Sequence, residues 1–254
     1  MLEVEHVSKR FEPPPRLLRL LSRVASPRTV QALTDVSLSA GRGEVVGLVG
    51  ANGAGKTTLL HIIAGLLEPS SGSVRVDGFD VVAESLEARR RLGLVIADDR
   101  GFYWRLTGME NLTLFGVLAG LPREEARARA DELMRQADLA RRDRMVFGYS
   151  SGMITRLHVA RALIANPPLL LLDEPTRSLD PLVSLEVGRL VRRLADEGHA
   201  VLLSSHDLGE VLKICDRVVV VNEGEVVLAD TAAGLRARED GVSGLLHALE
   251  GAAR

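Results

Sequence analysis

Short apolar runs recur along the chain, and each has the length and composition of a strand that is buried on both faces. The runs are Val45–Val49, Leu169–Leu172, Ala200–Ser204 and Val218–Val221. A helical pattern of apolar positions occupies Leu182–Glu197, between two of these runs. Strands that alternate with helices favour a parallel sheet with both faces covered. The pattern therefore predicts an α/β fold.

The N-terminal region has a different pattern. Residues 1–12 alternate between apolar and polar, which predicts an edge strand, and Leu33–Leu38 is a second predicted strand. Between them, residues 13–28 begin with three prolines and continue as a short basic amphipathic helix over 16–25. We interpret residues 13–28 as an insertion that either contacts an anionic membrane surface or folds back on its own domain.

The middle and the end of the chain are predicted to be helical. Residues 85–165 are rich in Arg, Glu and Ala with helical periodicity, which predicts an inserted helical subdomain. Residues 232–254 are predicted to be a helical tail, which either mediates dimer contacts or packs on the domain. We therefore predict one domain over 1–254, whose core is formed by 1–84 and 166–231.

Composition and charge exclude several classes of protein. Of the 254 residues, 46% are hydrophobic and 26% are charged, which is typical of globular proteins. The net charge of −2 disfavours nucleic-acid binding through a positive surplus, and a single cysteine, Cys215, excludes a disulfide framework. No apolar run approaches the roughly 20 residues that span a bilayer, and no signal peptide is recognisable. We therefore expect a cytoplasmic protein.

A glycine-rich segment follows the first buried run. It consists of Gly50, Ala51, Asn52, Gly53, Ala54, Gly55, Lys56, Thr57 and Thr58, and it fits the pattern G-x-x-x-x-G-K-[ST]. Glycines let successive amide groups turn inward around an anion, and the helix that follows adds its positive N-terminal end. Lys56 supplies a charge to the terminal phosphates, and the Thr57 hydroxyl is a ligand for Mg²⁺. The segment therefore predicts a nucleotide site.

Polar residues end two further predicted strands. Asp173 and Glu174 follow the run Leu169–Leu172, at the carboxyl end of a strand, where ligands bind in open α/β sheets. Asp173 is suited to the water shell of Mg²⁺, and Glu174 is suited to orienting or polarising an attacking water. His206 follows the next strand and is placed to contact a γ-phosphate. We assign catalytic roles to Glu174 and His206.

Together these motifs resemble those of the nucleotide-binding subunits of ABC transporters. Tyr149-Ser150-Ser151-Gly152-Met153 resembles the LSGGQ signature of that family, Ser178-Leu179-Asp180 its D-loop and Ser205-His206 its H-loop. The resemblance extends from about residue 2 to about residue 230. It implies a P-loop NTPase core of the RecA-like type, with N-terminal antiparallel strands and an inserted α-helical subdomain. It also implies ATP and Mg²⁺ as cofactors and places Phe11 at the nucleotide.

The signature segment predicts a second phosphate site. Ser150 begins a predicted helix, so its hydroxyl and the free amides after it attract an anion. In the family, the two phosphate sites of one chain lie too far apart to share one ATP. The resemblance therefore implies a head-to-tail homodimer, in which Ser150, Gly152 and Asp180 of one chain complete the ATP site of the other. ATP then becomes part of the interface, and hydrolysis loosens it.

The chain departs from the family pattern in two places. Of the signature, Ser150 and Gly152 remain, which keeps the hydroxyl and one permissive backbone position. The Q-loop glutamine is absent, and alignment of residues 95–99 puts Asp98 in its place, or Asp99 after a one-residue slip. An aspartate can hold Mg²⁺ but repels a γ-phosphate. We predict that Asp98 belongs to the catalytic and metal site and that basal turnover is weak until a partner closes it.

Aromatic residues point to a partner. Phe102-Tyr103-Trp104 either packs beneath the helical subdomain or forms a groove for a helix of a membrane subunit, as this region does in the family. Residues 100–112 look most like exporter-type subunits with separately encoded transmembrane partners. The helix over 16–25 resembles an insertion found in exporters of polysaccharides or lipid-linked glycans. We therefore predict an ATP hydrolase that powers an ABC exporter from the inner face of the cell membrane.

Two other functions are compatible with the motifs. One is a soluble ABC-type ATPase without a membrane partner, although residues 85–165 are too short for the long coiled coils of the chromosome-maintenance ATPases. The other is a regulatory nucleotide-binding module with little turnover. The presence of Lys56, Asp173 and Glu174 argues against the second alternative.

Overall fold

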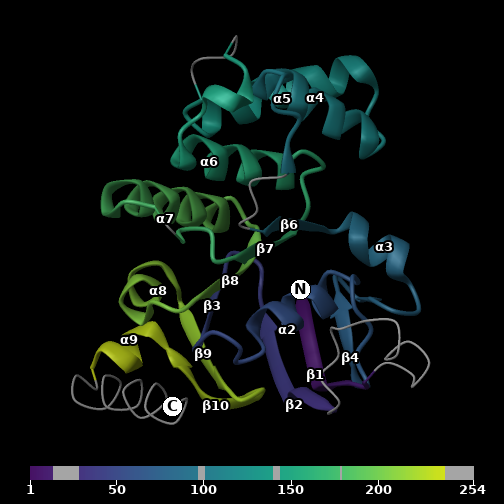
Figure 1. Ribbon diagram of the computed structural model, residues 1–254, viewed down its shortest axis with the longest axis vertical. Helices are drawn as coiled ribbons and strands as arrows, with labels where there is room; N and C mark the ends of the chain where they lie inside the picture. Colours follow the sequence, from purple (N-terminus) through teal and green to yellow (C-terminus); the bar gives the residue numbers. More distant parts are fainter. Residues whose placement is uncertain (14–28, 97–100, 140–143, 178, 238–254) are drawn as a thin grey trace.

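The computed structural model describes residues 1–13, 29–96, 101–139, 144–177 and 179–237 (Figure 1). Its strands are β1 (Leu2–Phe11), β2 (Val30–Ala40), β3 (Val45–Val49), β4 (Ser71–Val76), β5 (Phe79–Asp80), β6 (Leu92–Ile96), β7 (Leu169–Asp173), β8 (Ala200–Ser205), β9 (Arg217–Asn222) and β10 (Glu225–Thr231). Its helices are α2 (Lys56–Ile63), α3 (Ser85–Arg90), α4 (Gly108–Leu118), α5 (Arg123–Gln136), the 3₁₀ turn η2 (Val146–Gly148), α6 (Ser151–Ala162), α7 (Pro181–Asp196), α8 (Leu208–Ile214) and α9 (Ala232–Arg236). No helix in these ranges is both long and apolar enough to cross a bilayer.

The larger sheet contains every strand that the apolar runs predicted. Its order is β10-β9-β3-β8-β7-β6, in which β10 pairs antiparallel with β9 and the other strands are parallel. The parallel sheet was therefore predicted correctly.

Both faces of this sheet are covered, as expected, because its central strands alternate their side chains between two cores. Val45 and Val49 of β3 pack with the helices α6, α7 and α8 on one face. Val46 and Leu48 face the other core, which includes α2 and the smaller sheet. One face of the larger sheet is thus covered partly by a second sheet, whereas in many α/β folds helices alone cover both faces.

The smaller sheet is antiparallel, with the order β2-β1-β4-β5. β1 pairs with β2 on one side and with β4 on the other, so the expectation that residues 1–12 form an edge strand is wrong. The alternation of apolar and polar positions reports that one face of a strand is buried. It carries no information on how many neighbours the strand has along its hydrogen-bonding edges.

The predicted helical segment 85–165 is not helical throughout. It includes β6, which pairs with β7 from Leu92 opposite Leu169 to Ile96 opposite Asp173 and so belongs to the core sheet. The five-residue run of β6 is flanked by charged and helical sequence, which obscures it in a periodicity analysis. The helices α4, α5 and α6 form the upper lobe of the molecule (Figure 1). The basic helix predicted over 16–25 and residues 238–254 of the predicted tail lie outside the described residues.

Candidate functional site

The glycine-rich loop joins the end of β3 to the start of α2. Gly53 and Gly55 have φ angles of 85° and 105°, a region that favours glycine. A Cβ atom at Gly50 would lie 2.2 Å from the Val221 carbonyl oxygen, and one at Gly55 would lie 2.7 Å from the Ala32 carbonyl oxygen. α2 begins without a side-chain cap, so the amide groups of its first turn are available to an anion. The loop therefore has the form of an anion cradle.

Lys56 turns back into this loop. Its ammonium group donates hydrogen bonds to the carbonyl oxygens of Gly50 at 2.7 Å and Ala51 at 3.1 Å, and it lies 3.7 Å from Glu174 Oε1. Burial lowers the pKa of Lys56, while the negative charges of Glu174 and Asp173 oppose that shift. The positive charge is thus held at the cradle, next to the acidic end of β7.

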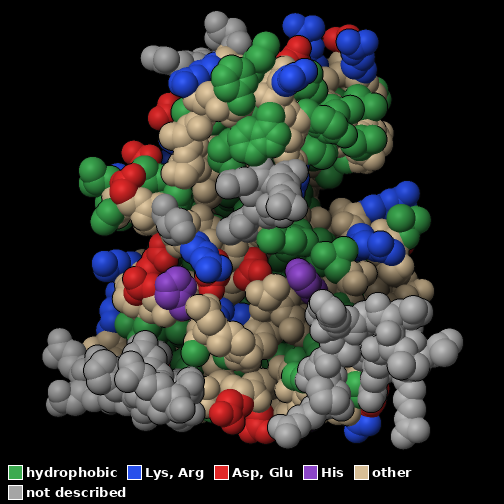
Figure 2. Space-filling model, viewed as in Figure 1, with side chains coloured by type: hydrophobic (Ala, Val, Ile, Leu, Met, Phe, Trp, Pro, Cys, Tyr) green, Lys and Arg blue, Asp and Glu red, His purple; other side chains and the backbone are tan. Residues whose placement is uncertain are grey.

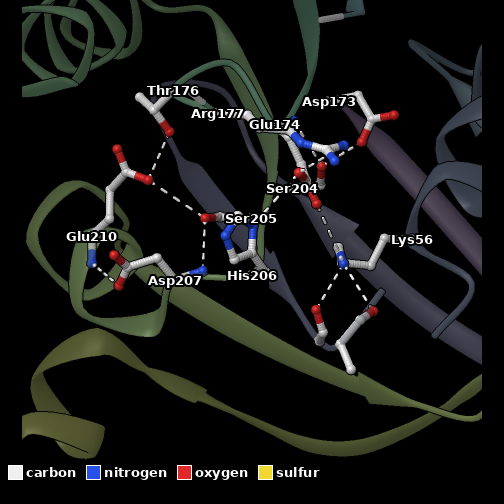
Figure 3. A network of polar contacts seen from close by, with 12 residues as sticks. Lys56, Asp173, Glu174, Thr176, Arg177, Ser204, Ser205, His206, Asp207 and Glu210 are labelled. Atoms are coloured by element: carbon white, nitrogen blue, oxygen red, sulfur yellow. Dashed lines mark hydrogen bonds and ion pairs between the residues drawn. The ribbon is translucent and has the colours of Figure 1, made fainter. Parts of the chain in front are cut away.

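Asp173 connects three elements at the end of the sheet. Its Oδ2 accepts a hydrogen bond from Thr57 Oγ1 at 3.0 Å. Its Oδ1 accepts one from Ser204 Oγ at 2.5 Å (Figure 3). Asp173 is buried, and the hydroxyl of Thr57 lies in the first turn of α2. A carboxylate and a hydroxyl at this separation are the oxygen donors that Mg²⁺ prefers. The predicted metal-binding residues Thr57 and Asp173 are therefore adjacent.

Glu174 lies between three nitrogen-bearing side chains. Its Oε2 is 3.5 Å from His206 Nδ1 and 3.6 Å from an Nη atom of Arg177, and its Oε1 faces Lys56 (Figure 3). The side chain is only 12% exposed. The residue has φ 46°, a left-handed backbone conformation that costs about 1–3 kcal/mol in a non-glycine residue. Its amide donates to Ser204 Oγ at 3.0 Å and to the Ser204 carbonyl at 3.2 Å, which holds this conformation.

A cavity of about 350 Å³ opens at these residues. Its walls include Asn52, Gly53, Gly55, Lys56, Thr57, Thr58, Asp173 and Glu174, all of them predicted from the sequence. Gly50, Ala51 and Ala54 belong to the same loop but do not line the cavity. Phe11 does not line it either, although it pairs with Val30, which does, and it is 41% exposed. His206 does not line the cavity, but its Nδ1 lies 3.5 Å from Oε2 of Glu174, which does.

The signature residues lie elsewhere in the fold. Ser150 caps α6, where its hydroxyl accepts a hydrogen bond from the Met153 amide at 3.3 Å. Asp180 caps α7 in the same way and accepts from two amides. Ser150, Gly152 and Asp180 are not among the described residues that line the nucleotide cavity. One chain therefore does not bring the two predicted phosphate sites into one cavity.

Some predictions fall on residues that the structure does not describe, and some site residues escaped prediction. Asp98, Asp99 and Ser178 lie outside the described ranges. Residues 30–32 of β2 line the cavity, yet only the packing of the smaller sheet brings them there. Arg177 also lines it, and its charge three residues after Glu174 was a signal that sequence analysis missed.

Comparison with known proteins agrees with this geometry. A family model described as ABC transporter matches residues 33–177. The ABC transporter ATP-binding protein NatA of Bacillus subtilis is 44% identical over 203 residues, which cover 79% of this chain and 82% of that protein. The daunorubicin resistance ATP-binding protein DrrA3 of Streptomyces coeruleorubidus is 44% identical over 212 residues, covering 83% and 67%.

A solved structure is similar over most of its length. The dimeric ATP-binding cassette MJ0796, in a post-hydrolysis state bound to ADP and Pi, has a TM-score of 0.77 and 28% identity. The match covers 91% of this chain and 99% of that chain. The family model, the relatives and the similar structure all agree with the motifs around Lys56 and Asp173. This chain therefore belongs to the ABC transporter family, as one of its ATP-binding and ATP-hydrolysing subunits.

Proposed function

We propose that this chain powers an exporter as a head-to-tail homodimer that binds two ATP molecules between its subunits. The observation that carries this proposal is the separation of Ser150 and Gly152 from the cavity that holds Lys56 and Glu174. The signature residues do not face the cavity of their own chain. In a head-to-tail dimer they would face the cavity of the second chain and complete its ATP site. The dimeric form of the similar MJ0796 cassette supports this arrangement.

Within each cavity, the loop amides and Lys56 hold the phosphates, and Thr57 and Asp173 hold Mg²⁺, which supplies charge neutralisation when bound. Phe11 at the rim contacts the nucleotide. Glu174 orients the attacking water and accepts its proton, and His206 contacts the terminal phosphate. Lys56, Arg177 and His206 contact the Glu174 carboxylate and fix its direction, which this role requires. Asp98 remains a predicted participant outside the described residues.

An exposed apolar patch supports a membrane partner. Tyr103, Trp104, Met145 and Phe147 are 41–69% exposed, and the Phe147 amide donates to the Trp104 carbonyl at 3.1 Å. Hydrophobic side chains gather over the same helical lobe (Figure 2). Phe102, in contrast, is buried against Phe115 and His158. Of the aromatic triplet, one ring therefore packs beneath the lobe and two remain exposed.

We infer that this patch binds a helix of a separately encoded transmembrane subunit, at the inner face of the cell membrane. Aromatic side chains are enriched at the energetic centres of such contacts. The direction of transport is supported by the relative DrrA3, whose name assigns it to daunorubicin resistance. The resemblance to glycan exporters depends on residues 16–25, outside the described ranges, and does not enter the proposal.

The proposed dimer is tested by measuring ATP turnover of the purified chain at several protein concentrations. A Glu174→Gln variant is measured in parallel. We expect turnover per chain to rise with concentration in the wild type and to be lost in the variant. The variant should form a dimer only when ATP is present, as seen by size-exclusion chromatography. Turnover per chain that is independent of concentration, with a variant that stays monomeric in ATP, would contradict a shared site. It would then favour an active site that is complete within one chain.

The partner surface has its own test. The chain is captured from detergent-solubilised membranes of its source, and polytopic proteins that co-purify are identified by mass spectrometry. Trp104→Asp should abolish their recovery. Leu86→Asp, at a more exposed apolar position on α3, should not. Equal recovery in both variants would reject the patch, and the absence of any polytopic partner would favour a soluble ATPase.

A further inference from the structure

Glu210 connects two loops that carry the proposed catalytic residues. Its Oε2 accepts a hydrogen bond from Thr176 Oγ1 at 2.7 Å and a longer one, of 3.4 Å, from Ser205 Oγ (Figure 3). Thr176 follows Glu174 by two residues, and Ser205 immediately precedes His206. A single carboxylate on α8 therefore joins the segment of the water-orienting glutamate to the segment of the histidine.

The start of α8 is built around the same contacts. Asp207 caps the helix, since its Oδ1 accepts a hydrogen bond from the Glu210 amide at 3.1 Å. The Asp207 amide in turn donates to Ser205 Oγ at 3.0 Å. Ser205 thus accepts from the cap and donates to Glu210, and the carboxylate is fixed relative to the end of β8.

Apolar packing does not support these loops from the side of α7 and α8. A cavity of about 870 Å³ lies there, and its lining includes Glu174, Thr176, Ser205, His206 and Glu210. Glu174 also has the left-handed backbone conformation described above, which persists only where its surroundings hold it. In this open region, the bridge through Glu210 spans the two loops in addition to the hydrogen bonds of Glu174 to Ser204 and the contact of Glu174 with His206.

A purely structural role is a poor explanation for a carboxylate at this position. Glu210 Oε1 is buried and has no hydrogen-bond partner among the described residues. Burying a polar oxygen without a donor costs free energy that an apolar side chain would avoid. The arrangement is understandable if the two accepted hydrogen bonds have a function.

We propose that Glu210 is a positioning residue for ATP hydrolysis, which holds Glu174 and His206 in the relative geometry that the reaction needs. This inference rests on the roles proposed above for Glu174 and His206. It predicts that loss of the bridge impairs the chemical step while ATP binding, which depends on the loop around Lys56, is retained.

The proposal is tested on the full chain with the variants Glu210→Ala and Glu210→Gln. Steady-state ATP turnover and nucleotide affinity are measured for each. Misplacement of a catalytic group by about 1 Å can cost roughly 100-fold in rate, so we expect kcat of Glu210→Ala to fall by about 10- to 100-fold. KM and ATP affinity should change by less than about 3-fold. Glu210→Gln should restore most of the rate, because its amide oxygen still accepts from both hydroxyls.

Glu125→Ala is the matched control. Glu125 occupies the same position in the first turn of α5 as Glu210 does in α8, and it is exposed with no polar contact among the described residues. Its removal should change kcat by less than about 2-fold. Thermal unfolding shows whether each variant folds, and Thr176→Val, which removes the stronger donor, replaces Glu210→Ala if that variant does not fold.

A second readout separates positioning from general damage. If Glu210 acts through Glu174, then Glu210→Ala should lower the residual turnover of a Glu174→Gln chain by less than about 2-fold. A full, independent loss in that background would overturn the proposal, as would wild-type kcat in Glu210→Ala or failure of Glu210→Gln to restore the rate. If Glu174→Gln itself turns ATP over as fast as the wild type, the proposed role of Glu174 fails, and with it this inference.

Discussion

Thr57 and Asp173 are 116 positions apart in the chain, yet the threonine hydroxyl donates a 3.0 Å hydrogen bond to the aspartate Oδ2. They meet because β3 and β7 both pair in parallel with β8, so that α2 and the end of β7 emerge at the same edge of the sheet. The second oxygen of Asp173 is held by Ser204 at the end of β8. Three strands thus orient one carboxylate.

Asp173→Asn should raise the Mg²⁺ concentration needed for half-maximal ATP turnover and lower the maximal rate by about 100-fold or more. The physical reason is the loss of a buried negative charge that complements the metal. A magnesium titration of turnover measures both quantities. Asp196→Asn, at the exposed end of α7, is the control and should leave the titration unchanged. An unaltered magnesium requirement in Asp173→Asn would reject this metal site.

Gly152→Ala should destabilise the fold because an added Cβ would lie 2.5 Å from Val183 Cγ1 on α7. Overpacking of this kind costs about 1–3 kcal/mol. Val183→Ala in the same chain should recover most of that loss. Denaturant unfolding of the single and double variants gives the coupling free energy between the two sites. Additive effects would show that the two side chains do not compete for the same space.

Asn111→Leu should loosen the loop that carries the exposed aromatic patch. Asn111 is completely buried, accepts a hydrogen bond from the Tyr103 amide at 2.9 Å and donates to the carbonyls of Tyr103 and Thr107. Unpaired buried backbone groups cost about 1–3 kcal/mol each.

We expect faster amide hydrogen exchange at residues 103–107 and weaker recovery of the membrane partner. Thr113→Val, on the same helix, removes only a hydrogen bond to the Met109 carbonyl and is the control. Exchange at 103–107 that is equal in both variants would contradict the role of Asn111.

Cys215 should make the stability of the protein fall at alkaline pH. Burial raises the pKa of its thiol from 9.0 to about 12. Between these values the unfolded chain loses the proton and the folded chain keeps it, so stability decreases as pH rises, by about 1.4 kcal/mol per pH unit. The free energies of unfolding of the wild type and of Cys215→Ala, compared under reducing conditions from neutral pH upward, measure this contribution of the thiol to stability. A constant difference between the two chains across that range would contradict the raised pKa.

Several features were predictable because they are local. The parallel strands were recognisable from runs such as Val45–Val49, since a strand covered on both faces has apolar side chains at every position. The phosphate loop was recognisable because glycine is required where φ is positive, as at Gly53 and Gly55. Ser150 was placed correctly at a helix start, because serine is favoured as a helix cap.

Other features were not predictable because they depend on contacts between distant segments. The interior position of β1 and the membership of β6 in the large sheet are decided by strand pairing, which periodicity does not report. The bridge from Glu210 to Thr176 and Ser205 requires that α8 and the ends of β7 and β8 lie together. No residue type or spacing within α8 indicates that contact.

The sequence by itself determined the chemistry proposed for this protein, because the residues predicted to bind phosphate and metal form motifs whose spacing is a property of the chain. Only the tertiary structure decided how that chemistry is arranged. Sheet order brings Thr57 to Asp173, surrounds Glu174 with Lys56, Arg177 and His206, and leaves Ser150 outside the cavity. These relations are distances between segments far apart in the chain, and packing alone sets them.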